Sequence, residues 1–446
     1  MLDECPVCLG TCDHVMWIQC THCKQWFHSR CLEIADYSLG DFVSYHCNKC
    51  TDKHGPSEHK RRSKRARTAI DYVALNEGDQ FALDKASHFQ LPKFLQFTGE
   101  KDIAVRNDLI ILNKPILVPN ADCGMKLPRP RKEITIDYIT DCCGPDRPVE
   151  VMDVISQQGV SPGWKLQQWR DYFETEEHHR DRLRNVISLE ISDAPGLGTK
   201  FQRPKLVREL DLVDKVWDDE QDRSKVTKYC LMSVKNSFTD FHIDFGGTSV
   251  YYTIIQGCKS FLMFPPTENN LDIYTSWCLK PNQNFIWYPE HFVYRNKEKV
   301  YPTGGFKVTL QPGDLFIIPS GWIHCVHTPQ DSIVIGGNYL TLRDMPMQLK
   351  IYDIERGTKD PTKFRFPMFN KDIWLSAIYY TNHRDEFKEV ENGSEIINAW
   401  VHHLERHLEL SKTNQTAKKS IPKLINPKQF LETLKSLKGT TAEDTM

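Results

Sequence analysis

The chain has 446 residues, of which 40% are hydrophobic and 26% charged, and its net charge is −2 with neutral histidines. This composition is typical of globular proteins, and the near-zero charge argues against an overall affinity for polyanions. No stretch approaches the ~18–20 apolar residues that cross a bilayer, and the start "MLDECPVCLG" lacks the features of a secretion signal. We therefore expect no membrane association, and the length suggests about three domains.

The first 50 residues hold eight of the chain's fifteen cysteines. Seven of these and one histidine form closely spaced pairs: Cys5-x2-Cys8, Cys20-x2-Cys23, His28-x2-Cys31 and Cys47-x2-Cys50. Because a tight turn can bring both members of a pair onto one tetrahedral zinc, eight ligands predict two closed, structural zinc sites. About 50 residues cannot bury enough core to fold alone, so the metal would supply the missing stability. The alternative is a set of reduced cysteines without metal.

The order of these ligands, with the motif "QWFH" at the histidine, resembles the PHD finger over residues 1–53. The resemblance implies interleaved sites, with one zinc on Cys5, Cys8, His28 and Cys31 and the other on Cys20, Cys23, Cys47 and Cys50. Many PHD fingers bind the N-terminal tail of histone H3. By this resemblance, Trp17 and Trp26 would form two walls that hold a methylated lysine by cation–π attraction.

The sequence does not determine whether the tail that the finger binds is methylated. Strong readers of methyl-lysine often carry an aromatic residue before the first zinc ligand, where this chain has Glu4. The finger is therefore compatible with a methylated or an unmodified tail, and the alternative for Trp26 is a place in the core.

A basic stretch, "KRRSKRAR" at 60–67, lies in the segment 54–70 that follows the finger. It is compatible with a solvated linker, a non-specific contact with the DNA backbone, or a nuclear import signal. Beside a chromatin-type finger we favour import and expect a nuclear protein. Residues 71–184 are a mixed lead-in, in which "DLIILNKPILV" at 108–118 predicts a strand pair.

The stretch "SFTDFHIDFGGTSVYY" contains one of the chain's three His-x-Asp dyads. The dyads that begin at His179 and His383 lie in charged stretches of helical character, where residues two apart point roughly 200° away from each other. Around His242 and Asp244, apolar residues alternate with the dyad before a β-branched and aromatic run, which predicts a strand. Since residues two apart on a strand share a face, only this dyad can chelate one ion.

An iron site of the oxygenase type needs a third protein ligand. The segment "LQPGDLFIIPSGWIHCVHTP" predicts two strands separated by a turn and contains His324 and His327. On a strand, these two histidines face opposite ways. One face consists of Trp322, His324 and Val326, and the other of Ile323, Cys325 and His327. The residue pattern alone does not choose between the two histidines.

The segments 230–267 and 316–340, with "FHIDFGGTSVYY", "GCKSFLMF" and "PSGWIHCVHTP", resemble the JmjC domain of histone lysine demethylases. The match extends upstream through "NVISLEIS" and downstream through 346–367. The downstream part is closest to the branch that acts on lysine 36 of histone H3, here of a fungal type without the CXXC module, F-box and leucine-rich repeats of animal relatives.

This resemblance implies a double-stranded β-helix (jelly-roll) barrel with flanking helices over 185–345. It implies that His242, Asp244 and His324 bind Fe(II), with His327 in a supporting or packing role. It also implies that Lys259 and Thr239 bind the cosubstrate 2-oxoglutarate, and that Asn185 and Tyr252 bind it or line its pocket. Taken alone, Lys259 is better explained as an exposed turn lysine after Gly257, and only the full set of family residues favours the cosubstrate role. Departures from the family occur at Tyr251, Thr253, Cys258 and Cys325.

Residues 346–446 predict a helical region. The segment "SEIINAWVHHLERHLEL" places an apolar stripe on one helix face, formed by Ile397, Trp400, Val401, Leu404 and Leu408. His403 and His407 lie four apart on the same helix, but neither a third ligand nor a carboxylate base accompanies them. We expect both histidines at the surface.

Together these patterns predict a multidomain chain: a two-zinc PHD finger, a JmjC barrel and a C-terminal helical region. The family resemblance implies a 2-oxoglutarate-dependent dioxygenase that demethylates mono- or dimethyl lysine 36 of histone H3, releasing formaldehyde and succinate. Its partners would be the histone H3 tail and the nucleosome. The alternatives are a chromatin reader or scaffold with an inactive barrel and a hydroxylase of a non-histone protein. The intact iron and cosubstrate residues argue against the inactive barrel.

Overall fold

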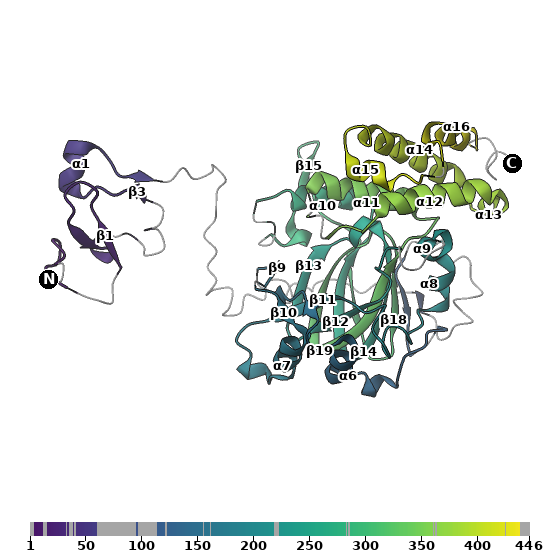
Figure 1. Cartoon of the computed structure of the whole chain (residues 1–446), viewed down its shortest axis with the longest axis horizontal. Helices are drawn as coiled ribbons and strands as arrows, with labels where there is room; N and C mark the ends of the chain where they lie inside the picture. The colour runs from purple at the N-terminus through teal and green to yellow at the C-terminus, as the bar shows by residue number, and fades with distance from the viewer. Residues whose placement is uncertain are drawn as a thin grey trace. The chain divides into compact units, whose positions relative to one another are not determined.

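The computed structural model describes residues 4–11, 16–32, 34, 39, 42–59, 95–96, 114–120, 123–154, 156–160, 162–217, 223–281, 283, 286–359, 361, 364–423 and 425–437. The chain divides into two compact units, Met1–Ile70 and Asp71–Met446 (Figure 1). Among the described helices, none is long and apolar enough to cross a membrane. The basic stretch 60–67 and residues 108–113 of the predicted strand pair lie outside the described residues.

The described residues of the N-terminal unit form two small antiparallel ladders, one α-helix and a 3-10 helix at Arg30–Leu32. Its elements are β1 (Trp17–Gln19) paired with β2 (Trp26–His28), β3 (Phe42–Ser44) paired with β4 (Glu58–His59), and α1 (Asn48–His54). Cysteines form much of its buried cluster, which otherwise contains Ile18, Phe27 and Tyr45. Such a small apolar core fits a unit that would gain stability from bound metal.

The second unit is built on one large sheet of eleven strands among the described residues. In sheet order these are β5 (Leu95–Gln96), β6 (Ile116–Val118), β18 (Leu315–Ile318), β14 (Ser249–Phe264), β19 (Ile323–Tyr339), β12 (Tyr229–Ser233), β11 (Arg184–Glu190), β8 (Met152–Asp153) and β9 (Gln158–Gly159). Two further strands complete it, with β13 (Phe238–His242) on β19 and β17 (Phe306–Leu310) on β14.

The two long strands, β14 and β19, run antiparallel and connect the two halves of a roll. The first part of β14 pairs with β18 and its last part with β17, while β19 pairs first with β13 and then with β12. The bend in β14 contains Gly257, at φ +78°, where an added Cβ would lie 2.1 Å from the carbonyl oxygen of Asp331. Only glycine fits this close approach. The arrangement confirms the predicted β-roll.

Apolar clusters fill the roll and cover its outside. Tyr252, Phe261 and Phe316 belong to the interior cluster. Outside, the helices α6 (Ile136–Cys143) and α7 (Leu166–Glu174) pack against one part of the sheet, and α10 (Glu268–Cys278) covers another. Two short helices, α8 (Lys205–Leu210) and α9 (Leu212–Val216), and the two-residue strands β7 (Pro148–Val149) and β10 (Trp164–Lys165) lie in the connections. A hairpin of β15 (Val293–Arg295) and β16 (Glu298–Val300) precedes β17.

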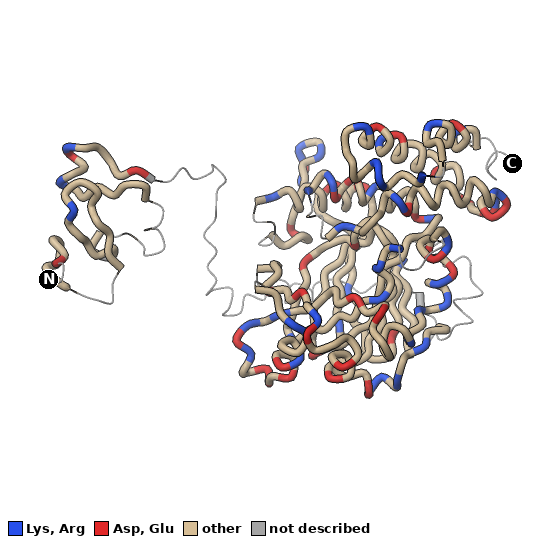
Figure 2. The backbone as a smooth tube through the Cα atoms, viewed as in Figure 1, with Lys and Arg blue, Asp and Glu red and all other residues tan. Residues whose placement is uncertain are grey.

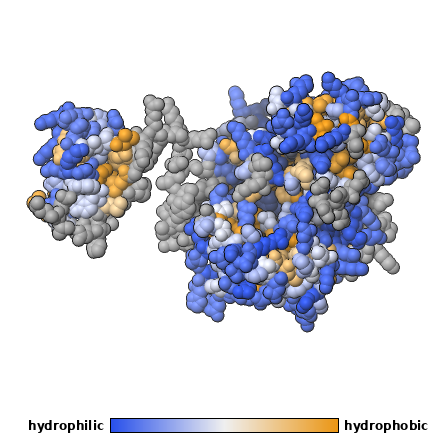
Figure 3. Space-filling model, in the orientation of Figure 1, coloured by the Kyte–Doolittle hydropathy of each residue, from blue (hydrophilic) through white to orange (hydrophobic). Residues whose placement is uncertain are grey.

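The C-terminal region is helical, as predicted, and lies along one end of the roll (Figure 1). Its helices are α11 (Met345–Thr358), α12 (Phe369–Asn382), α13 (Arg384–Lys388), α14 (Gly393–Leu410), α15 (Gln415–Ser420) and α16 (Pro427–Ser436). The apolar stripe predicted on α14 belongs to the cluster that these helices share. Figure 3 shows a largely hydrophilic outer face, with apolar residues visible between the helices.

The prediction that His403 and His407 lie at the surface is wrong, because they are only 5% and 4% exposed. His403 Nε2 donates to Asn370 Oδ1 at 2.8 Å, and His407 Nδ1 accepts from Trp374 Nε1 at 3.0 Å. Burial, with charged neighbours, lowers the pKa of His403 to about 3 and that of His407 to about 4, so both rings are neutral. Since α14 packs against α11, α12 and α16, its buried face is wider than the apolar stripe.

Candidate active site

Three potential metal ligands meet at the start of β19. His242 ends β13, Asp244 follows it, and His324 is the cross-strand partner of His242. One ligand atom from each residue lies within 4.8 Å of the others, and His324 Nε2 is 3.8 Å from Asp244 Oδ2. The bend after β13 thus brings both members of the predicted dyad to the same point as His324.

Backbone hydrogen bonds fix the tautomer of both histidines. His242 Nδ1 donates to the carbonyl oxygen of Asp240 at 2.7 Å, and His324 Nδ1 donates to that of Trp322 at 3.0 Å. In the neutral form of each ring, Nε2 is therefore the unprotonated nitrogen and can bind a metal. Asn338 Nδ2 lies 3.3 Å from Asp244 Oδ1 and 2.9 Å from Thr248 Oγ1, so it orients the carboxylate.

The electrostatics of the three ligands favour a bound cation. Burial raises the pKa of Asp244, although His242 and the bond from Asn338 act against it. Burial and the neighbouring His242 lower the pKa of His324 well below its usual value. A divalent cation would stabilise both the carboxylate and the neutral imidazoles. Two histidines and one carboxylate are a ligand set that suits iron, so these residues could hold Fe(II).

His327 lies on the other face of β19. Val326, two residues from His324, packs into the interior cluster, whereas Ile323 and Cys325 belong to the cluster beneath α10. This is the alternation predicted from the sequence, and the structure settles which face is interior. His327 Nε2 is buried without a hydrogen-bond partner and does not join the metal-competent group.

The other His-x-Asp dyads do not form such sites. Asp181 pairs with Arg184 at 2.6 Å, and Asp385 pairs with Lys388 at 3.2 Å. Neither carboxylate therefore joins its histidine at a metal site.

A buried lysine lies elsewhere in the roll. Lys259 is 3% exposed, and its Nζ donates to Ser233 Oγ at 2.6 Å and to Thr328 Oγ1 at 2.7 Å. Burial lowers its pKa to about 7, and Cys258 only partly offsets this. Among the described acidic residues, none forms an ion pair with it. A buried ammonium with one remaining N–H fits an anionic ligand, and its burial excludes the exposed turn lysine.

Hydrogen bonds connect this lysine to the strand that carries His242. Ser233 Oγ donates to Asn185 Oδ1 at 2.5 Å, and Asn185 Nδ2 donates to Thr239 Oγ1 at 3.2 Å. The polar row thus runs from Lys259 through β12 and β11 to β13. A dicarboxylate with one end at the lysine and the other at the metal fits this arrangement.

Tyr252 lies in the interior cluster and is 6% exposed. Its ring packs edge to face on Phe261, at 5.3 Å between centroids. Burial, followed by the nearby Asp244, raises the pKa of its phenol, so the hydroxyl stays protonated. It can donate a hydrogen bond inside the roll.

Comparison with known proteins places this geometry in a family. Residues 158–344 match the family described as Cupin-like domain, and residues 343–438 match the Jumonji helical domain. The chain is 64% identical over 435 residues to the JmjC domain-containing histone demethylation protein 1 of Candida albicans. The aligned region covers 94% of this chain and 91% of that protein. This chain belongs to the family of JmjC domain-containing histone demethylation proteins.

A more distant family member is the protein of the same name from Saccharomyces cerevisiae. It is 37% identical over 422 residues, covering 80% of this chain and 82% of that protein. The Debaryomyces hansenii protein of that name is 50% identical over 487 residues, covering 94% and 95%. The JmjC barrel and the helical region after it are therefore family features.

Several residues of this JmjC site were not predicted from the sequence. Ser233 and Thr328 contact Lys259, and Asn338 contacts Asp244. Thr328 lies four residues after His324 on one strand, so a period of two would have placed it on the interior face. No comparable signal in the sequence points to Ser233 or Asn338.

Gln157 is a further residue that the sequence did not reveal. It lies at φ +53° between β8 and β9. Its Nε2 donates to the carbonyl oxygen of Phe238 at 3.0 Å, and its Oε1 accepts from the backbone N–H of Asp240 at 3.1 Å. The side-chain amide of Gln157 therefore bonds to the backbone on both sides of Thr239, as a neighbouring strand would. The pairing of β13 with β19 is irregular between Thr239 and His242.

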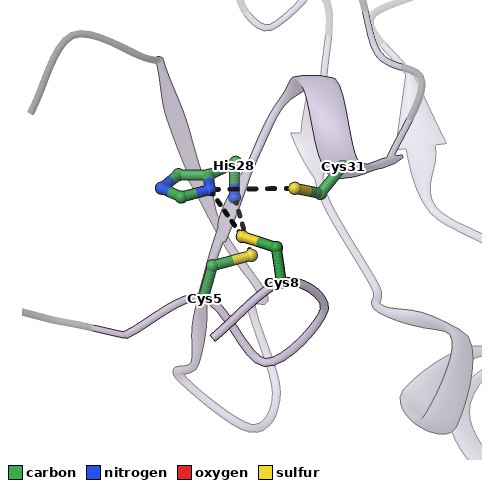
Figure 4. Close-up of side chains that lie close together, drawn as sticks. All are labelled: Cys5, Cys8, His28 and Cys31. Carbon is green, nitrogen blue, oxygen red and sulfur yellow. Dashed lines mark hydrogen bonds between the residues drawn. The ribbon is translucent and has the colours of Figure 1, made fainter. Parts of the chain in front are cut away.

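The N-terminal unit brings eight ligands together in two groups. The first contains Cys5, Cys8, His28 and Cys31, and the second Cys20, Cys23, Cys47 and Cys50. In the first, His28 Nδ1 lies 3.2 Å from Cys8 Sγ and 3.7 Å from Cys31 Sγ (Figure 4). In the second, the sulfurs of Cys23 and Cys47 are 3.8 Å apart.

Backbone donors favour thiolates in both groups. Burial raises the pKa of Cys5 and Cys20, but N–H groups outweigh it and lower these values to about 7 and about 6. These donors include the N–H of His28 for Cys5 and that of Cys47 for Cys20. In the same groups the side chain of Cys8 and burial raise the pKa of Cys31 to about 11, and burial raises that of Cys50 to about 12. Three cysteines with a histidine in one group and four cysteines in the other are ligand sets that suit zinc.

The two predicted cage tryptophans share one face of the β1–β2 hairpin. Trp17 is the cross-strand partner of His28, and Trp26 that of Gln19, so the two tryptophans are diagonal neighbours. The buried residues Ile18 and Phe27 occupy the opposite face. Trp17 packs on the His28 ring at 3.9 Å, while Trp26 is partly exposed.

Proposed function

We propose that this chain is an Fe(II)- and 2-oxoglutarate-dependent demethylase of methylated histone lysine, with mono- or dimethyl lysine 36 of histone H3 as its substrate. The observation that carries the proposal is a single roll holding both the His242, Asp244 and His324 group and the unpaired ammonium of Lys259. The names of the relatives support a histone substrate. The resemblance of residues 346–367 supports lysine 36.

Each interior residue has a role in this proposal. His242, Asp244 and His324 hold the iron, and Asn338 keeps the carboxylate oriented. With dioxygen and 2-oxoglutarate, the iron supplies oxidation of the N-methyl group, which is released as formaldehyde while succinate forms. Lys259 neutralises the far carboxylate of the cosubstrate by a charge-assisted hydrogen bond.

Neutral hydrogen-bond donors complete the cosubstrate pocket in the proposal. Thr239 and Asn185 form the end of the polar row nearest β13, and the Tyr252 hydroxyl donates from the interior cluster. The apolar walls around Tyr252 exclude water from the reacting atoms.

The finger brings the enzyme to chromatin in this proposal. Two structural zinc ions sit in its ligand groups, and Trp17 and Trp26 form two walls for a histone H3 tail. The partly exposed Trp26, which is outside the buried cluster of this unit, supports a binding role. The basic stretch 60–67 directs import into the nucleus.

The test is formaldehyde release from a panel of histone H3 peptides, each methylated at one lysine and in one state. We expect release from mono- and dimethyl lysine 36 in the presence of Fe(II) and 2-oxoglutarate, and much less from the other lysines. Release from another lysine only would refute the specificity. Succinate formation with a hydroxylated peptide that keeps its methyl groups would identify a hydroxylase, and peptide binding without turnover would identify a reader.

A further inference from the structure

The last part of the helical region contains a lysine-rich segment without acidic residues. Residues 411–431, "SKTNQTAKKSIPKLINPKQFL", contain five lysines and no Asp or Glu. Lys412 pairs with Glu409. The other four, Lys418, Lys419, Lys423 and Lys428, are exposed and form no ion pair with any described residue. We call these four residues the lysine surface.

Apolar residues between the lysines hold this segment on the helical core. Ala417 is buried, and Ile421, Ile425 and Phe430 pack against the cluster shared by the C-terminal helices. The helix α15 contacts α12 and α14, and α16 contacts α14 (Figure 1). Since the apolar side chains occupy the inner side, the intervening lysines project into solvent.

Three acidic residues of the neighbouring helices already pair with other lysines. On the C-terminal half of α14, Glu405 pairs with Lys435 at 2.8 Å and Glu409 pairs with Lys412. Glu432 on α16 also pairs with Lys435, at 3.1 Å. The lysine surface therefore keeps four positive charges without compensation, although the whole chain is close to neutral (Figure 2).

We propose that the lysine surface binds the phosphodiester backbone of double-stranded DNA beside the histone substrate. The proposal rests on the proposed function, because histone tails emerge from DNA-wrapped particles. Lys418 and Lys428 are ten residues apart, and so at most about 35 Å. All four lysines can thus reach phosphates within about one turn of a duplex.

The residues around the lysines favour a duplex backbone over other polyanionic partners. The exposed large hydrophobic residues of the described chain all lie outside this segment, so nothing here would insert into a membrane. Its one aromatic residue, Phe430, packs inward, whereas single-stranded nucleic acids are bound by stacking bases on exposed aromatic rings. The side chains of Asn414 and Asn426 cap α15 and α16. Contacts between lysines and phosphates do not depend on base sequence.

The test compares the full chain with a variant in which all four lysines are replaced by glutamine. Each phosphate contact adds about 0.9 to the slope of log affinity against log salt, so four contacts add about 3.6. Between about 50 and 200 mM salt, the wild type should lose affinity for a duplex of about 30 base pairs roughly 150-fold more than the variant does. The pair Lys418→Gln and Lys419→Gln should show about half of the change in slope.

The control is the double variant Lys412→Gln and Glu409→Gln, which removes a neutralised pair from the same segment and should leave the slope unchanged. Peptide demethylation should be equal in all variants, while the four-lysine variant should lose activity on nucleosomes. An unchanged salt slope in the four-lysine variant would overturn the proposal. If that variant also lost activity on nucleosomes, the lysines would contact a protein instead of DNA. The salt slope is measured by DNA binding alone, without turnover. A failure of the proposed enzymatic function would therefore not affect the test of DNA binding.

Discussion

The buried Lys259 offers the sharpest test of the cosubstrate pocket. Lys259→Met keeps the length of the side chain and removes its charge. If the ammonium contacts the far carboxylate of 2-oxoglutarate, the variant loses a charge-assisted hydrogen bond of about 1.5–3 kcal/mol. The apparent affinity for 2-oxoglutarate should then fall roughly ten- to a hundredfold.

The lowered pKa of Lys259 predicts how this affinity depends on pH. Burial holds the pKa of the free site at about 7, so the ammonium loses its proton as the pH rises through 7. The cosubstrate binds the charged form, so the Michaelis constant for 2-oxoglutarate should rise above pH 7 in the wild type. The Lys259→Met variant should lack this dependence.

The same shift predicts an effect on stability. The unfolded chain holds this proton to a higher pH than the folded chain does, so this group adds stability as the pH rises from about 7 towards 10. At pH 7 the unpaired ammonium costs the fold on the order of 4 kcal/mol. Lys259→Met should therefore lose cosubstrate affinity without a lower melting temperature.

The assay measures initial rates of formaldehyde release against 2-oxoglutarate at several pH values, together with thermal melting. Lys228 provides a matched control, because it is a partly buried lysine that donates to the carbonyl oxygen of Gly198 at 2.7 Å, outside the polar row. Lys228→Met should leave the Michaelis constant unchanged. If Lys259→Met left the Michaelis constant for 2-oxoglutarate unchanged, Lys259 would not contact the cosubstrate. A higher Michaelis constant accompanied by a lower melting temperature would likewise refute the direct contact.

Three other changes test separate parts of the site. His324→Ala should abolish turnover whereas His327→Ala only impairs it, and the reverse result in formaldehyde assays would show that the other face of β19 holds the metal. Gln157→Leu should destabilise the fold by about 1–3 kcal/mol and weaken the affinity for 2-oxoglutarate, since Thr239 lies between its two contacts. The same change at the exposed Gln158 should do neither. Trp26→Ala should weaken binding of a trimethyl-lysine-4 tail peptide about five- to thirtyfold in titrations, and tighter binding of the unmodified peptide would contradict a methyl-lysine cage.

The strand pattern singled out the His242 and Asp244 dyad, which the structure brings together with His324, although β13 ends at His242 and Asp244 lies beyond the strand. Alternation also separated His324 from His327, but it could not say which face is interior. That depends on pairing with β13 and β14, which lie far away in the chain. The burial of Lys259 likewise depends on hydroxyl groups 26 and 69 residues away.

The helical region shows the limit of a periodic pattern. The stripe on α14 was predicted correctly, but His403 and His407 lie beside it and are buried. A neutral histidine can occupy a core when another side chain bonds to its ring, here Asn370 to His403 and Trp374 to His407, although Nε2 of His407 has no hydrogen-bond partner among the described residues. Those partners come from another helix, so the spacing of the histidines gives no sign of them.

Turnover by a His242→Ala protein whose iron content has been measured tests the assignment of the iron site most directly. Iron content, melting temperature and formaldehyde release from a dimethyl-lysine-36 peptide would be measured on the wild type and the variant. The wild type should release formaldehyde and succinate in equal amounts. A folded His242→Ala protein should bind little iron and release no formaldehyde, while its finger still binds the tail peptide. Full demethylation by that variant would contradict the assignment of the site.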